Sequence, residues 1–285
     1  MAASTPTYIR PLGTMVAYGF ERGSVLSDLQ IADRLGASLL EILPDWRAYP
    51  DPCEMRSIAE GHGFAIHSAH GCWGGQSIRA ARVDLGSTDK ETWSASIDDL
   101  RRCLDWLRDA GGTCLVVHPG GRSDPSESTA RRESLRLGLE VLADHIAGSD
   151  LVACVENMPP GVYPGSETYP IASLVAEIGR PEIALALDTG HANLVESAEK
   201  ETLAAGSLLV TTHVHDNDGR ADSHRPPGLG TVDWSRWSSA LDAIGYRGPI
   251  MLECIRELRK NPETIDQAFL ARLDMLRTGG SSPVA

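Results

Sequence analysis

The chain has 285 residues and carries 39 acidic against 26 basic side chains, which gives a formal net charge of −13. Hydrophobic residues make up 42% and charged residues 23%, a balance that excludes a disordered or fibrous protein. No stretch approaches the ~18 apolar residues of a membrane span, and residues 1–10 lack the parts of a secretory signal. Six cysteines without a CxxC pair are typical of a reduced, cytoplasmic protein. The acidic balance also disfavours nucleic acid as the main partner.

Short aliphatic runs alternate with helical patterns along the chain. Strands are predicted at residues 15–20, 38–43, 64–67, 113–118, 151–156, 183–188, 208–215 and 249–253. These runs are apolar throughout rather than alternating, as expected for parallel strands that are buried on both faces. The clearest helices are predicted at 89–110, which ends at a glycine pair, and at 124–147.

This alternation predicts the α/β class and a single-domain (β/α)8 TIM barrel over residues 1–285. Residues 278–285 are small and polar, and we expect them to form a frayed tail. The alternative is an open doubly wound sheet. That fold usually has a glycine-rich turn after its first strand, and residues 20–24 do not form such a turn.

Polar side chains occupy the carboxyl ends of six consecutive predicted strands. In chain order they are His67, His118, Glu156, Asp188, His213 and Glu253. A lone histidine there is more often structural, and a lone carboxylate often caps the next helix. Because the strand ends of a barrel converge on one mouth, six consecutive strands that end in such residues favour a metal site. Imidazoles mixed with carboxylates suit Zn, Mn, Co or Fe better than Mg or Ca.

Several segments together resemble the xylose isomerase-like barrel superfamily, which contains sugar phosphate isomerases and epimerases as well as endonuclease IV. They are His118-Pro119-Gly120, Val155-Glu156-Asn157, the DTGHAN stretch at 188–193, the segment 213–234 and Met251-Leu252-Glu253. The resemblance spans nearly the whole chain and depends on the order and spacing of these segments.

The resemblance implies one to three divalent ions. In the isomerase and epimerase branch one ion is held by residues that match Glu156, Asp188, His213 and Glu253, and the two glutamates also act as acid and base. Endonuclease IV adds a zinc at positions that match His67, His118 and Glu156, and another at positions that match His191, Asp222 and His224. The motif spacing favours His213 over His215, which we expect to face the other way in a regular strand, although the strand register stays open.

Departures from endonuclease IV argue for a small substrate. His70 stands where that enzyme has a tyrosine that contacts DNA, and no basic loop interleaved with aromatic residues is present. We interpret Trp46 as part of a sugar-stacking wall. Together with His70 and the flanking Arg220 and Arg225, it completes the predicted substrate-binding set.

The leading hypothesis is a metal-dependent isomerase or epimerase, or a related dehydratase or lyase. It would act on a sugar, sugar phosphate or polyol through an enediolate. The alternative is an endonuclease IV-like trinuclear phosphodiesterase or AP endonuclease. A barrel that only binds a ligand is a third reading, against which the intact ligand set argues. The expected partner is a small carbohydrate rather than a membrane or nucleic acid, and a homo-oligomer is compatible with the sequence.

Overall fold

Strands and helices alternate along the computed structural model, which describes residues 8–20, 25–76, 78 and 82–279. The strands are β1 (Leu12–Tyr18), β2 (Leu39–Pro44), β3 (Ala65–His70), β4 (Cys114–Val117), β5 (Val152–Glu156), β6 (Ile183–Asp188), β7 (Leu209–His213) and β8 (Ile250–Leu252). The α-helices are α1 (Val25–Leu35), α2 (Pro52–Gly61), α3 (Lys90–Ala110), α4 (Ser128–Ile146), α5 (Thr168–Ile178), α6 (Thr189–Val195), α7 (Ala198–Ala205), α8 (Trp234–Ala243), α9 (Ile255–Lys260) and α10 (Gln267–Thr278).

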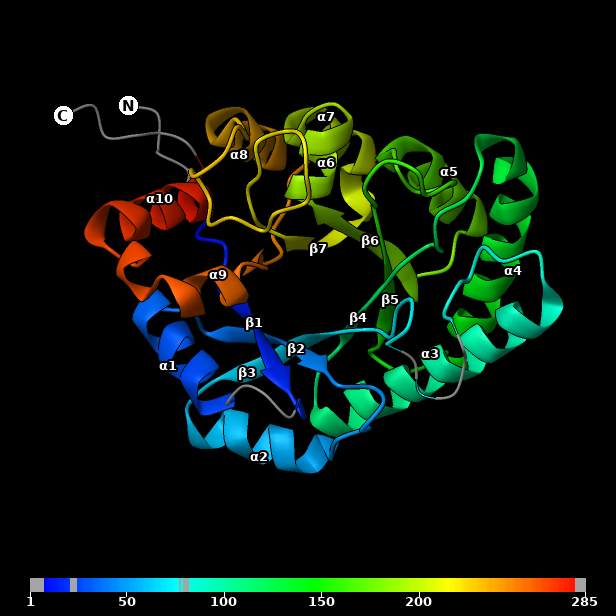
Figure 1. The fold of residues 1–285 in the computed structure, drawn as a ribbon, viewed down its shortest axis with the longest axis horizontal. Coiled ribbons are helices and arrows are strands. Elements are labelled where there is room, and N and C mark those ends of the chain that lie inside the picture. The colour runs from blue at the N-terminus through cyan, green and yellow to red at the C-terminus, as the bar shows by residue number, and fades with distance from the viewer. Residues whose placement is uncertain (1–7, 21–24, 77, 79–81, 280–285) are drawn as a thin grey trace, which may run out of the picture.

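The strands form one parallel sheet that closes on itself, with the helices around it (Figure 1). The sheet order runs from β7 back to β1 and then to β8. A parallel bridge between Val214 and Leu252 joins β7 to β8, and the Val214 N–H donates to the Met251 carbonyl at 2.7 Å. The predicted (β/α)8 barrel is therefore confirmed, and the open doubly wound sheet is wrong.

Two apolar clusters fill the molecule. The larger one lies between the strands and the helices, where Leu100, Leu104 and Leu107 of α3 are fully buried, as their spacing predicts. A smaller cluster, which includes Cys114, Cys154 and Ala186, comes from strands β4, β5 and β6, and Val210 of β7 packs against it. The strands are thus apolar on both faces, which explains why their sequences do not alternate.

The third strand departs from its predicted bounds. It runs to His70 instead of ending at His67, and its pairing with β2 shifts between Leu40 and Glu41. Leu40 pairs with Ile66 but Glu41 pairs with Ser68, which leaves His67 as the extra residue of a β-bulge. The carboxyl end of this strand therefore lies at His70, three residues beyond the predicted end.

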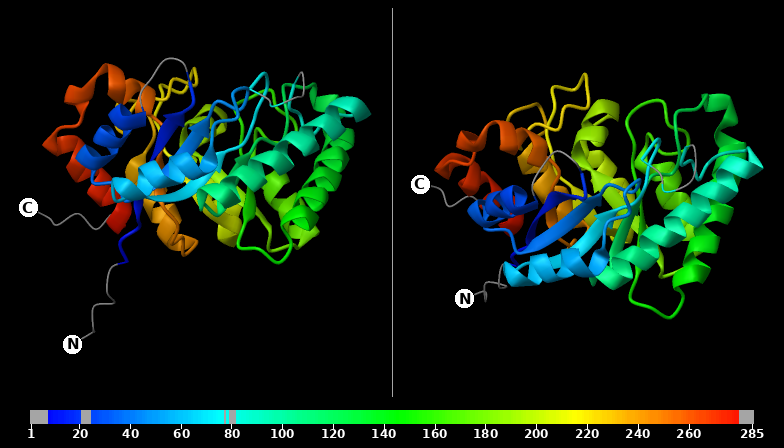
Figure 2. Two further views of the ribbon diagram at one scale, coloured as in Figure 1. Left: turned by 90° about the horizontal axis from the view of Figure 1, so that it is seen from below. Right: turned by 60° about the horizontal axis from the view of Figure 1, so that its bottom comes forward.

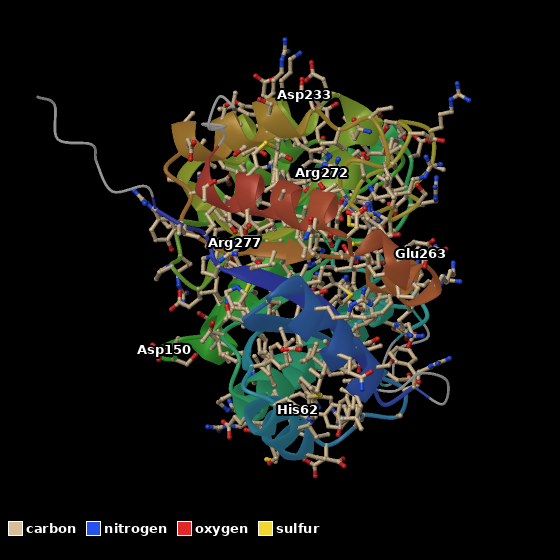
Figure 3. All side chains as sticks on the ribbon, turned by 90° about the vertical axis from the view of Figure 1, so that its left-hand side faces the viewer. His62, Asp150, Asp233, Glu263, Arg272 and Arg277 are labelled. Carbon is tan, nitrogen blue, oxygen red and sulfur yellow. The ribbon has the colours of Figure 1, made fainter. Side chains whose placement is uncertain are left out.

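Charged side chains cover the outside of the barrel. Figure 3 shows His62, Asp150, Asp233 and Glu263 on the periphery, and all four are exposed. Among the described residues, no helix combines the length and the apolar character needed to cross a bilayer. The yellow segment that follows β7 rises from one end of the barrel (Figure 2), and two of the predicted ligands, Asp222 and His224, belong to it. Residues 280–285 of the predicted tail lie outside the described residues.

Candidate metal centre

The carboxyl ends of four strands bring together the residues that the epimerase resemblance selects. Glu156 and Asp188 end their strands, His213 ends β7, and Glu253 directly follows β8. Each of the four offers one ligand atom, and these atoms all lie within 4.8 Å of one another. The first three are at most 1% exposed, whereas the Glu253 side chain is 14% exposed. The centre is therefore buried and opens to solvent on the Glu253 side.

His213 lies between three carboxylates. Its Nδ1 is 2.8 Å from Glu156 Oε1 and 3.0 Å from Glu253 Oε2, while its Nε2 is 2.7 Å from Glu41 Oε1. Burial lowers the pKa of His213, but the three carboxylates outweigh it and hold that pKa well above the usual 6.5. Without a metal ion the ring is thus a cation that offsets part of the surrounding negative charge.

Glu156 also joins a second group with His70 and His118. His118 Nε2 lies 3.2 Å and His70 Nε2 3.9 Å from Glu156 Oε2. His70 Nδ1 donates to the Gly71 carbonyl at 2.8 Å, so Nε2 carries the lone pair that faces the glutamate. Burial lowers the pKa of His70, and a neutral imidazole is the form that binds metals.

A third group gathers His191, Asp222 and His224. The Nε2 atoms of the two histidines lie 3.3 and 3.2 Å from the same oxygen, Asp222 Oδ2. Burial lowers the pKa of each ring, but neighbouring carboxylates raise both pKa values to about 10. The same two rings hold the pKa of Asp222 well below its usual range, against the effect of burial.

His215 is the residue that links the inner and outer groups. The expectation that it faces away from His213 is wrong, because residues two apart lie on the same side of an extended chain. Its Nε2 is 2.9 Å from Asp188 Oδ2, and its ring stacks on His224 with centroids 4.0 Å apart. Gly190 leaves room for this ring, because a Cβ on that residue would overlap His215. The structure thus brings both His213 and His215 to the centre.

The segment after β7 is fixed by the buried Asp216. Its Oδ1 accepts from the N–H groups of Asn217 and Val232, at 2.9 and 3.1 Å. Its Oδ2 accepts from Gly228 N at 2.8 Å and from the Trp234 indole at 3.1 Å. Its backbone also pairs with Arg225, next to His224, whose left-handed φ of 45° is rare outside glycine. Asp216 therefore holds in place the segment that carries Asp222 and His224.

The donor set fits a divalent cation. Glu156 Oε2, Glu253 Oε2 and His215 Nδ1 are buried and receive no hydrogen bond from the described residues. Imidazole nitrogens do lie nearby, at 3.2 Å from Glu156 Oε2 and 3.0 Å from Glu253 Oε2, but several carboxylates buried together are costly unless positive charge offsets them. Oxygen and imidazole ligands together suit Zn, Mn, Co or Fe, as the sequence predicts.

Four residues of the predicted site lie elsewhere or have other roles. His67 occupies the bulge, and its buried Nε2 has no partner among the described residues. Trp46 is fully buried and donates to the His70 carbonyl at 3.0 Å, so no ring face is open for a sugar. Arg225 contacts Asp218 at 3.2 Å within its own segment, and Arg220 is exposed. For Arg220 and Arg225, substrate binding stays a prediction.

Sequence reasoning missed Glu41 and Asp216, and it assigned no metal to His70. Glu41 is a lone acid inside the apolar run Leu39–Pro44, and that isolation is a signal that could have found it. Asp216 directly follows the paired histidines of the HVHD segment, and nothing in the sequence marks it as a loop anchor. His70 could be recognised as a candidate metal ligand only once the position of the bulge was known.

The comparisons with known proteins agree with the fold. The chain is 28% identical over 235 residues to an L-ribulose 3-epimerase of Methylomonas sp. (strain DH-1), which covers 78% of this chain and 75% of that protein. It is 26% identical over 242 residues to a ketose 3-epimerase of Arthrobacter globiformis, covering 82% and 78% of the two chains.

Two of the solved structures that this chain resembles match over nearly their whole length. A D-tagatose 3-epimerase-like protein superposes with a TM-score of 0.73 at 18% identity, covering 92% of this chain and 98% of that one. A 3-keto-D-glucoside 4-epimerase from E. coli gives 0.72 at 20% identity, with 94% and 99% covered. At these identities the likeness supports the barrel fold alone. A family model described as xylose isomerase-like TIM barrel matches residues 29–277, so the chain belongs to that family.

Proposed function

We propose that this protein is a divalent-metal-dependent sugar epimerase or isomerase. Its substrate would be a ketose, a sugar phosphate or a related polyol, and the reaction would pass through an enediolate. The observation that carries the proposal is the convergence of Glu156, Asp188, His213 and Glu253, whose ligand atoms lie within 4.8 Å of one another. The distant homology to ketose 3-epimerases supports it.

The two glutamates are suited to move protons. Burial raises the pKa of each glutamate, but nearby histidines outweigh it. His213 and His118 lower the pKa of Glu156, and His213 and His224 lower that of Glu253, so both pKa values lie below the usual range. Both are therefore ionised at neutral pH and able to accept a proton. They come from β5 and from the end of β8, on separate strands of the barrel. One could remove a proton from the carbon next to a carbonyl, and the other, once it has taken up a proton from solvent, could deliver that proton to the opposite face, which would invert that carbon.

A divalent ion held by these four residues would stabilise the negative charge that develops on the substrate's neighbouring oxygens. Two further ions fit the remaining groups, one at His70, His118 and Glu156 and one at His191, Asp222 and His224. In this assignment His70 takes the place that the sequence prediction gave to His67. Ligand atoms of His70, His118 and Glu156 converge, whereas His191 and His224 converge with His215 in two further groups that do not include Asp222. The number of ions, one to three, is therefore part of the proposal.

The test is proton exchange at the reacting carbon. Protein loaded with Mn²⁺ or Co²⁺ is incubated in D₂O with ketoses such as L-ribulose, D-tagatose and D-allulose, and with ketose phosphates. We expect the C3 epimer of at least one sugar, with deuterium at C3. The metal-free protein is the control. If the loaded protein exchanges no carbon-bound hydrogen in any of these sugars, the proposal is wrong.

An endonuclease IV-like phosphodiesterase is the second candidate, and one observation favours it. The Nε2 atoms of His191 and His224 both contact one oxygen of Asp222. The single-metal reaction does not need these three residues. The net charge of −13 argues against DNA as substrate, because phosphate contacts require basic side chains. We therefore expect no incision of a labelled abasic-site duplex at near-physiological salt. Efficient metal-dependent incision would reverse the ranking.

A further inference from the structure

We propose that Glu41 is a positioning residue that orients His213 toward the metal centre. Glu41 lies on β2, inside the barrel and away from the carboxyl ends that supply the candidate ligands. It is fully buried and contacts His213, itself fully buried. This inference rests on the proposed function, because it concerns the same metal centre.

Both carboxylate oxygens of Glu41 have defined partners. The Ser68 hydroxyl donates to Oε2 at 2.6 Å, and His213 Nε2 donates to Oε1 at 2.7 Å. Ser68 is buried on the neighbouring β3, where the bulge at His67 brings it into register with Glu41. The carboxylate is thus held from one side and directed at the imidazole on the other.

The contact selects the nitrogen that His213 offers. Because Nε2 donates to Glu41, Nδ1 is the atom that faces Glu156 Oε1 at 2.8 Å and Glu253 Oε2 at 3.0 Å. A carboxylate behind a metal-binding imidazole fixes its tautomer and its orientation and raises its basicity. His70, His191 and His224 instead donate their Nδ1 protons to backbone carbonyls. Of these four rings, His213 is the one whose other nitrogen contacts a carboxylate behind it, that of Glu41.

A purely structural role does not account for this charge. An apolar side chain of the same volume would fill the barrel interior without the cost of burying a carboxylate. Glu41 is instead retained among other buried carboxylates, where it adds negative charge close to the candidate ligands. This placement makes sense if the charge acts through His213 on a bound cation.

The experiment measures Co²⁺ binding to the full chain, with its visible absorption as a report on the ligand geometry. In Glu41→Gln the volume is kept and the charge is lost. We expect the affinity for Co²⁺ to fall about 10–100-fold and the absorption bands to shift. Glu41→Asp keeps the charge, and we expect it to restore part of the affinity. The matched control is Glu201→Gln, which alters another buried glutamate whose partner is the N–H of Thr168 in α5.

The outcomes separate the inference from the proposed function. If the parent protein binds no Co²⁺, the metal centre of the proposed function is wrong. If the parent binds Co²⁺ and Glu41→Gln has the same affinity and spectrum, the role of Glu41 alone is overturned. Should Glu41→Gln fail to fold, Ser68→Ala carries the test, because it removes one hydrogen bond of Glu41. We then expect weaker Co²⁺ binding and a shifted spectrum, and an unchanged Ser68→Ala would refute the inference.

Discussion

Each of three imidazoles in the metal centre uses Nδ1 for a backbone carbonyl and turns Nε2 toward a carboxylate. His70 donates to Gly71, His191 to Asn157 and His224 to Glu253, all at 2.8–2.9 Å. Such a hydrogen bond fixes the tautomer, because the nitrogen that donates cannot also bind an ion. The backbone thereby determines in advance which nitrogen each ring offers to a metal.

The roles of Glu156 and Glu253 can be separated from metal binding by substitution with glutamine. Glutamine keeps the shape and a carbonyl oxygen that can contact an ion, but it cannot accept the substrate's proton. We expect Glu156→Gln and Glu253→Gln to lose at least about 100-fold in turnover. Added Mn²⁺ should restore metal occupancy more readily than activity. The measurement is solvent deuterium entering the carbon next to the carbonyl, with circular dichroism as the check on folding. Parent-like exchange in both variants would refute the two-carboxylate mechanism.

The bulge at His67 leads to a prediction about which histidine of β3 binds metal. His70 Nε2 faces Glu156, whereas His67 is absent from the groups of ligand atoms that converge in the described structure. We expect His70→Ala to lower zinc content by about one equivalent when the parent holds more than one. His67→Ala is the matched control and should leave zinc content unchanged. Elemental analysis of protein purified without chelator gives the answer. Loss of zinc in His67→Ala but not in His70→Ala would restore the original sequence prediction.

At the scale of single residues, the sequence marks those whose chemistry stands out and does not mark those whose role depends on geometry. His118, Glu156, Asp188 and Glu253 are polar at the ends of apolar runs, and the structure brings them to one end of the barrel. His213 and His215 share a face, so alternation cannot choose between them. Glu41 escaped notice because a strand buried on both faces has no periodicity that marks its inner side.

At the scale of elements, the segment between β7 and α8 shows how an irregular stretch is made rigid. Four donors reach the carboxylate of Asp216, and its backbone pairs with Arg225. The positive φ of His224 is tolerated because these bonds hold its surroundings. A loop that carries two candidate ligands is thereby fixed from its base.

Asp216→Ala should release this segment. The substitution leaves four buried donors without their acceptor, and we expect a loss of about 2–4 kcal/mol in the free energy of unfolding. Metal binding at Asp222 and His224 should weaken even under conditions where the barrel stays folded. Urea unfolding measures the first effect, and hydrogen exchange of residues 217–233 measures the second. Asp218→Ala is the control, because that exposed carboxylate contacts Arg225 in the same segment. If exchange in both variants matches the parent, Asp216 does not anchor the loop.

Element boundaries were predictable where apolar runs end abruptly and not where pairing is irregular. β6 has the predicted bounds 183–188, because Asp188 ends the apolar run and caps the following helix. β3 continues past His67 because the bulge is set by its pairing with β2, which a single segment's sequence does not contain. The predicted helix 124–147 begins as a 3-10 turn at Pro125–Glu127 before α4.

At the scale of the whole molecule, the acidity has two separate origins. The periphery carries exposed carboxylates such as Asp150 and Glu263, which keep a protein dissolved (Figure 3). The barrel interior and its mouth bury others, including Glu41, Glu156 and Asp188, which are at most 1% exposed. The net charge that disfavours nucleic acid is therefore also, in part, the charge that favours a bound cation.

This buried charge predicts how the stability of the metal-free protein depends on pH. The pKa values of His191 and His224 are raised to about 10 from 6.5. A raised pKa gives stability that is full below pH 6.5 and is lost as the pH rises through the folded-state value. The lowered pKa values of His67 and His70 act in the opposite sense, so their contribution is full above pH 6.5 and is lost as the pH falls. The lowered pKa values of Asp222 and Glu253 add to the loss of stability in acid, as the pH falls below their ordinary pKa values of 3.8 and 4.5.

We therefore expect protein treated with chelator to be most stable near pH 6.5 and to weaken steadily toward pH 10. The measurement is the urea midpoint at fixed ionic strength over this range. With excess Zn²⁺ the alkaline trend should reverse, because the ion displaces protons from the imidazoles and binds more tightly as they are released. His224→Asn is the informative variant, since removing that ring should flatten the alkaline loss of the metal-free protein. A metal-free midpoint that rises between pH 6.5 and 10 would show that these histidines are not held as cations by the buried carboxylates.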